Sequence, residues 1–211
     1  MRKINIGMAS TLFIALATAG CSPDSGAEKG SAVSSAEQQT MEVVTNTSFK
    51  TVVPAMMKLV TEKVQSEGAA AAVAFCNENV AGMGKEMRDK LAAQFKESNG
   101  VSDFSFGRTT LKVRNPNNTP DAVMKEVLLA WQSEEENGKE AEMVIRKSGN
   151  VLYGLKPIRI VSPTCLKCHG TDGTRDAEAS KVIKARYPQD AAMDYYENEL
   201  RGAFWVKARL D

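Results

Sequence analysis

The sequence predicts a single α+β domain with an antiparallel sheet, and three observations lead to that class. Apolar residues recur at helical spacing in the first half of the chain, later segments alternate as strands do, and a Gly-containing turn joins two of these strands. Helices and strands do not alternate regularly, which favours α+β over a parallel α/β sheet. The 211 residues are enough for one stable core.

The first residues have the pattern of an export signal. Two basic residues precede an apolar run over residues 4–17, and small residues lead to Cys21. The run is too short to span a bilayer comfortably, and Cys21 after small residues resembles a bacterial lipoprotein processing site. We expect a signal peptide over residues 1–20, a lipidated Cys21 and a flexible tether over residues 21–36. The protein would then be anchored on the periplasmic side of a bacterial membrane, with the outer membrane preferred; the alternative is a soluble periplasmic protein.

The domain itself is expected over residues 37–211, and it begins with a long N-terminal helix. Apolar residues at helical spacing continue to about residue 66, although Pro54 is expected to bend or divide this helix. An alanine-rich helix follows over residues 69–80, and two glycines then separate it from a helix over residues 85–97.

Strands dominate the rest of the domain. The expected elements are a strand over residues 101–113, a helix over 119–136, a hairpin of strands over 140–146 and 151–161, a short helix capped by Thr164, helices over 178–186 and 191–200, and a last strand over 202–210. The charge composition gives little information about function, because 27 Lys and Arg balance 26 Asp and Glu and no basic run occurs. The sequence therefore shows no electrostatic footprint for nucleic acid.

One segment, Cys165-Leu166-Lys167-Cys168-His169, carries a recognisable chemistry. In c-type cytochromes, two cysteines at this spacing attach heme through thioether bonds, and the adjoining histidine is the proximal ligand of the iron. His169 is the only histidine in the chain, so a chance position beside the Cys-x-x-Cys pair is improbable. The motif predicts one covalent heme c on Cys165 and Cys168, with His169 bound to its iron.

Cys76 remains once the other three cysteines are assigned. It lies on the small-residue face of the predicted helix over residues 69–80. Two interpretations are open: Cys76 is a small buried hydrophobe, which is common for a free cysteine, or it is the sixth ligand of the iron. Methionine is the other usual ligand in the absence of a second histidine, and Met83, between two glycines, is the most accessible candidate.

Several segments together resemble a known family. They are the run over residues 107–118, the strand over 153–158 that leads into the Cys165-x-x-Cys168-His169-Gly170 motif, the turn over 187–191, and Arg201-Gly202-Ala203-Phe204. The family is one of exported, single-heme c-type cytochrome domains with a PAS-like fold, catalogued as a domain of unknown function. Its members occur alone and as sensory ectodomains of signalling proteins. The resemblance covers about residues 47–210 and implies a PAS-like antiparallel sheet flanked by helices.

The resemblance also implies a ligand set. By it, the heme is c-type, His169 is the proximal ligand, and a cysteine on an early helix, which aligns with Cys76, is the distal ligand. Arg108 and Arg114 have two interpretations, solvated arginines near a turn or partners of the heme propionates through charge-assisted hydrogen bonds.

A thiolate opposite an imidazole favours ferric iron and a low potential. We therefore expect an electron carrier, or a redox or gas sensor, with a redox or signalling protein as partner and little reason to expect an enzyme. Two other classes fit the same residues less well. They are a structural zinc site of Cys76, Cys165, Cys168 and His169, and a thiol–disulfide oxidoreductase that uses Cys165 and Cys168.

Overall fold

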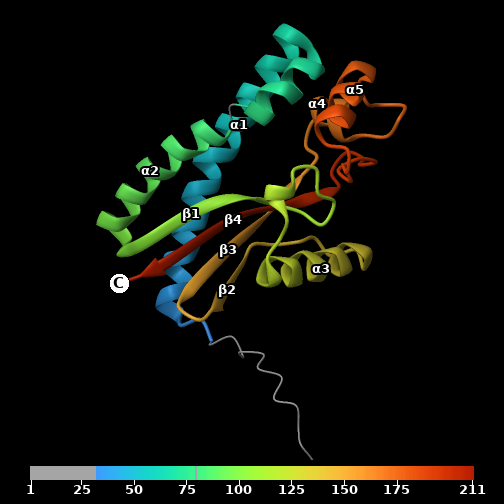
Figure 1. Ribbon diagram of the computed structural model, residues 1–211. Helices are drawn as coiled ribbons and strands as arrows, with labels where there is room; N and C mark the ends of the chain where they lie inside the picture. Colours follow the sequence, from blue (N-terminus) through green and yellow to red (C-terminus); the bar gives the residue numbers. More distant parts are fainter. Residues whose placement is uncertain (1–31, 79) are drawn as a thin grey trace, which may run out of the picture.

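A computed structural model describes residues 32–78 and 80–211, with side chains outside 77–83. The elements are α1 (Ser35–Glu78), α2 (Val80–Asn99), β1 (Val101–Thr109), η1 (Pro116–Asn118), α3 (Ala122–Glu136), β2 (Val144–Ser148), β3 (Val151–Arg159), α4 (Pro163–His169), α5 (Ala177–Arg186) and β4 (Leu200–Leu210) (Figure 1). The strands form one antiparallel sheet in the order β1-β4-β3-β2. The predicted α+β class, with a long N-terminal helix and an antiparallel sheet flanked by helices, is confirmed.

Among the described residues, none of the helices is both long and apolar enough to cross a bilayer. The predicted signal peptide, the Cys21 lipidation site and most of the predicted tether lie outside the described residues.

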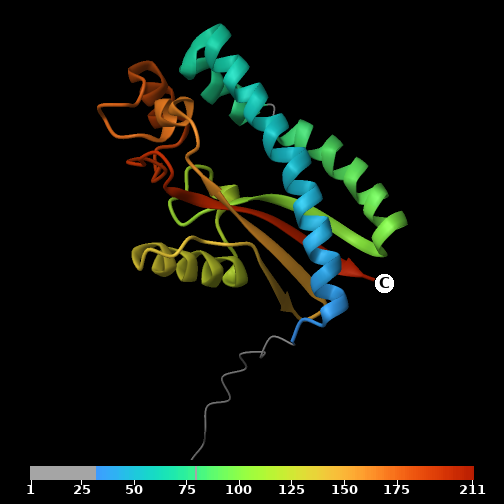
Figure 2. The same ribbon diagram turned by 180° about the vertical axis from the view of Figure 1, so that it is seen from behind.

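Each face of the sheet packs against its own helices. Phe204, Val206 and Ala208 of β4 alternate toward α1 and α2, where they join a buried apolar cluster. Ala203 and Trp205, which alternate with these residues along β4, belong to or pack against a second cluster with α3. Figure 2 shows α1 running along the first of these faces. The central strand therefore holds both layers together.

The long helix breaks at a glycine rather than at the proline. Within α1, non-helical dihedral angles occur at Gly68, with φ 87° and ψ 168°, and Pro54 lies inside the helix. The expectation that Pro54 divides the helix is wrong. Pro54 is exposed, so water can satisfy the carbonyl whose hydrogen bond the proline removes, while Val52 is buried in the core. Gly68 tolerates a positive φ that other residues disfavour.

Three further local expectations are wrong. The helix expected from residue 85 already begins at Val80, so the two glycines lie within α2. The short helix that carries the cysteine motif is capped by Ser162, whose side chain accepts a hydrogen bond from the Thr164 amide at 3.2 Å. Residues 191–200 form no helix before β4; positive φ values at Asp194 and Asn198 interrupt the segment.

Helix α1 approaches the sheet closely at a glycine. A Cβ added to Gly154 of β3 would overlap Thr45 Oγ1 of α1, and Thr45 is fully buried. Gly154→Ala is therefore expected to lower the free energy of unfolding by about 1–3 kcal/mol through overpacking. Denaturant unfolding measures the change. Gly84→Ala is the matched control because nothing lies within 4 Å of its added Cβ, and it should be neutral or slightly stabilising. Equal stabilities of the two variants would contradict the packing argument.

Candidate functional site

The cysteine motif lies on α4, beyond one end of the sheet. Figures 1 and 2 both show α4 and α5 beside the C-terminal part of α1. Pro163 occupies the first turn of α4, where its missing amide hydrogen costs nothing. The seven residues of α4 place Cys165, Cys168 and His169 on little more than one helical turn. The structure thus brings the three predicted attachment residues together on one short, capped helix.

His169 is fixed by a backbone carbonyl. Its Nδ1 lies 2.9 Å from the carbonyl oxygen of Ala192, and its ring meets the Tyr195 ring edge-on at 6.3 Å between centroids. A carbonyl can only accept a hydrogen bond, so Nδ1 carries the proton and Nε2 keeps a lone pair. Burial, then the charges of Arg201 and Arg114, holds the pKa of His169 well below its ordinary value. The imidazole is therefore neutral and offers Nε2 as a metal ligand.

Arg114 is a structural clamp on this helix. Its Nε and Nη2 donate to the two carboxylate oxygens of Asp190 at 3.1 and 3.0 Å. Nη2 also contacts the carbonyl oxygens of Cys168 and Ala192, at 2.7 and 3.1 Å. The side chains of Arg114 and Asp190 are only 13% and 4% exposed, so the pair is buried. Through Ala192, this pair also fixes the carbonyl that orients His169.

Two further arginines face the same region. Arg108 is exposed on β1. Arg201, on β4, donates from Nη1 to Thr110 Oγ1 at 2.9 Å and lies over the Tyr195 ring at 5.2 Å. Burial and the charges of Arg114 and Arg108 lower the pKa of Arg201, while Tyr195 raises it. Arg201 was not predicted as a site residue, although it begins one of the segments that carry the family resemblance.

Cys76 lies in the same neighbourhood. Burial raises the pKa of its thiol, whereas the charges of Arg108 and Arg114 lower it. Burial also raises the pKa of Cys168 to about 11, with the charge of Arg114 opposing this and that of Cys76 adding to it. The electrostatic coupling places Cys76 near Cys168 and both predicted arginines. The side chain of Met83, the rival sixth ligand, lies outside the described residues.

The small-residue face of α1 packs against another helix. Ala69 and Val73 form a buried cluster with Ala179 and Ile183 of α5, and Cys168 packs against it. The alanines therefore allow α5 to approach closely and bring α4 with it. Cys76, one turn beyond Val73, is only half-buried at this junction.

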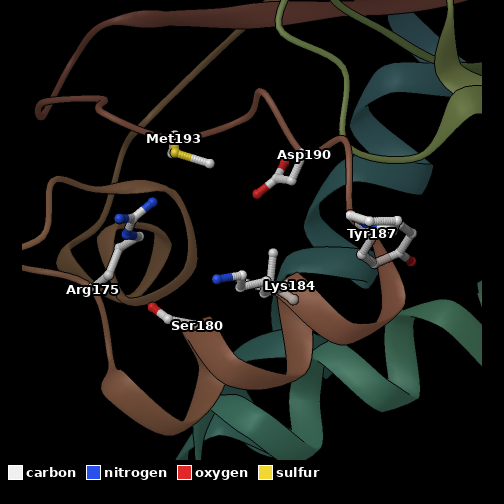
Figure 3. A pocket seen from close by; sticks show the side chains of 8 residues that line it. Arg175, Ser180, Lys184, Tyr187, Asp190 and Met193 are labelled. Atoms are coloured by element: carbon white, nitrogen blue, oxygen red, sulfur yellow. The ribbon is translucent and has the colours of Figure 1, made fainter.

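A cavity of about 300 Å³ lies on the outer side of the junction. Figure 3 shows Ser180 and Lys184 of α5 opposite Asp190 and Met193, which belong to the loop before β4. The loop therefore has two roles, since it lines this cavity and also supplies the Ala192 carbonyl to His169.

The two other classes receive no support from this arrangement. Among the described side chains, no group of three or more His, Cys, Asp or Glu could hold a metal ion, as a zinc site requires. Burial is the main cause that raises the pKa values of Cys165 and Cys168. A catalytic thiol needs the opposite shift, because the thiolate is the nucleophile in disulfide exchange.

Comparison with known proteins identifies the family. No curated protein matches the chain. Among solved structures, it is similar to one described as the crystal structure of the cyanobacterial heme-protein Tll0287, with 25% sequence identity, coverage of 61% of this chain and 70% of that chain, and a TM-score of 0.44. The model of the Tll0287-like family (Tll0287) matches residues 27–208. The chain therefore belongs to the Tll0287-like family.

Proposed function

We propose that this protein is an exported mono-heme cytochrome of the c type. One heme would be bound through thioethers to Cys165 and Cys168, with His169 as proximal ligand and Cys76 as distal ligand. The observation that carries the proposal is the bond from His169 Nδ1 to the Ala192 carbonyl at 2.9 Å. This hydrogen bond leaves the lone pair of Nε2 on a neutral imidazole available to a metal. His169 follows directly after two cysteines at the spacing of heme attachment.

The donor set fits heme in two further respects. Thioether formation needs two unpaired cysteines, and Cys165 and Cys168 are both free thiols. A distal ligand needs to come from a different element, and Cys76 is on α1, which packs against α4 and α5. A thiol on one element and an imidazole on another can bind from opposite sides.

Electron transfer is the proposed activity. Heme supplies a one-electron couple between ferric and ferrous iron, and a thiolate ligand favours the ferric form. The clamp of Arg114 and Asp190 keeps His169 in one orientation, so the ligand geometry should change little between the two oxidation states. We propose a low-potential carrier that exchanges electrons with a partner protein.

Redox sensing is a second candidate, and Cys76 is the observation that favours it. Burial raises the pKa of this thiol, so Cys76 would take up a proton from solvent whenever it is not held as a ligand. A ligand that is released and protonated on reduction could open a site for a small gas. A signalling partner would be needed to read this change.

A mass spectrum of the mature protein tests the proposal. Protein made with a cytochrome maturation system should carry the mass of one heme, because the proposal has the free thiols of Cys165 and Cys168 add to its vinyl groups. The Cys165→Ser/Cys168→Ser variant should lack this mass. A colourless protein with both thiols free would overturn the assignment of heme.

The same spectrum also reports any lipid on the N-terminal residue. We propose that Cys21 is lipidated and anchors the domain to the periplasmic face of a membrane.

A further inference from the structure

Arg201 is a partly buried cation whose Nε is removed from water. Its Nε is buried and has no hydrogen-bond partner, and Nη1 is bound to the neutral Thr110 hydroxyl at 2.9 Å. Among the described side chains, those of residues 32–76 and 84–211, no carboxylate forms an ion pair with Arg201. A charged group that is partly removed from water without a charged partner is unfavourable, so such a group normally has an anion beside it.

The neighbouring arginines increase this cost. Arg114 and Arg108 both act on Arg201 as like charges. The charge of Arg114 is balanced by Asp190, to which two of its nitrogens donate. Arg108 has no carboxylate partner in the described part of the chain. Two positive charges, those of Arg201 and Arg108, therefore remain uncompensated beside His169.

We propose that Arg201, assisted by Arg108, binds a carboxylate of the heme. This inference rests on the proposed function and refines it, because from the sequence Arg108 and Arg114 were the candidates for that role, with solvated arginines near a turn as the alternative. Arg114 is already committed to Asp190 and to the carbonyls of Cys168 and Ala192. A guanidinium with a free Nε matches a carboxylate, which accepts charge-assisted hydrogen bonds on both of its oxygens.

Ligand esterification tests the inference without changing the fold. The full chain with Cys165→Ala and Cys168→Ala is titrated with hemin or with hemin dimethyl ester, whose carboxylates are masked, and absorbance reports binding. The ester should bind about tenfold more weakly, as expected for loss of a hydrogen bond between charged groups. Arg201→Gln should remove the difference between the two ligands, and Arg201→Lys should restore part of it. Arg209→Gln, an exposed arginine at the far end of β4, is the matched control and should keep the difference.

The outcomes separate the two proposals. Equal binding of hemin and its ester by the chain with Arg201 intact would overturn this inference while leaving the heme assignment in place. Absence of binding for both ligands would also overturn the inference, whereas the heme assignment is decided separately by the mass of the matured protein with both cysteines present. The holoprotein gives an independent readout, since Arg201→Gln should lower the midpoint potential by removing a positive charge that disfavours ferric iron, whereas Arg209→Gln should not. An unchanged potential in Arg201→Gln would also contradict the inference.

Discussion

Asp190→Asn is expected to lower the free energy of unfolding by about 3–5 kcal/mol, the usual cost of removing one partner of a buried ion pair. The Asp190 side chain is 4% exposed, and it accepts from two nitrogens of Arg114 and from the Ala192 amide at 2.8 Å. The amide of the new asparagine would keep the shape but leave the Arg114 guanidinium buried without an anion. The loop that supplies the Ala192 carbonyl would then lose its anchor. Denaturant unfolding of the protein without heme measures the effect.

Two controls distinguish this cost from a general effect of losing a carboxylate. Asp89→Asn removes one partner of an exposed pair with Lys85, at 2.8 Å, and should change the free energy of unfolding by less than about 0.5 kcal/mol. Adding Arg114→Leu to Asp190→Leu removes both charges and should be less destabilising than Asp190→Leu alone. A loss below 1 kcal/mol for Asp190→Asn would show that the Arg114–Asp190 pair does not hold the loop.

Local patterns were sufficient where an element is stabilised by its own residues. The hairpin of β2 and β3 turns at a glycine with positive φ, Gly149, as its composition predicted. Helix α3 was expected from its apolar spacing, although it begins at Ala122, after the Asp121 cap, and not at residue 119. The helix predicted over residues 191–200 was wrong for the opposite reason. The weak helical propensity of this segment is overridden by backbone hydrogen bonds to α4, such as that from Tyr195 N to His169 O at 3.0 Å.

The site shows the same division between local and distant contacts. The attachment motif is contiguous, so its residues could be identified and placed on a short helix from the sequence. The clamp could not, because Arg114 and Asp190 are separated by 76 positions and no local pattern pairs one with the other. Arg201 was missed for a related reason: its lack of a counter-ion is visible only after β4 lies beside Thr110 and Tyr195.

Cys76→Ala should produce the largest change in the spectrum and potential of the holoprotein. If Cys76 is the distal ligand, its loss removes the thiolate that favours ferric iron, so the midpoint potential should rise and the ferric absorption bands should shift. The variant should still fold, because Cys76 is only half-buried and Ala fits the small-residue face that Ala69 and Val73 form with α5. Covalent attachment should also persist, since it depends on Cys165 and Cys168.

Met83→Leu is the matched control for Cys76→Ala, because Met83 is the rival ligand from the same part of the chain. It should leave the ferric spectrum and the potential unchanged. The reduced Cys76→Ala protein should bind carbon monoxide at least as readily as the parent, because no thiol competes for the site. A ferric spectrum that is the same in Cys76→Ala as in the parent, together with a shifted spectrum in Met83→Leu, would transfer the distal position to methionine. Release of Cys76 on reduction would then no longer explain redox sensing.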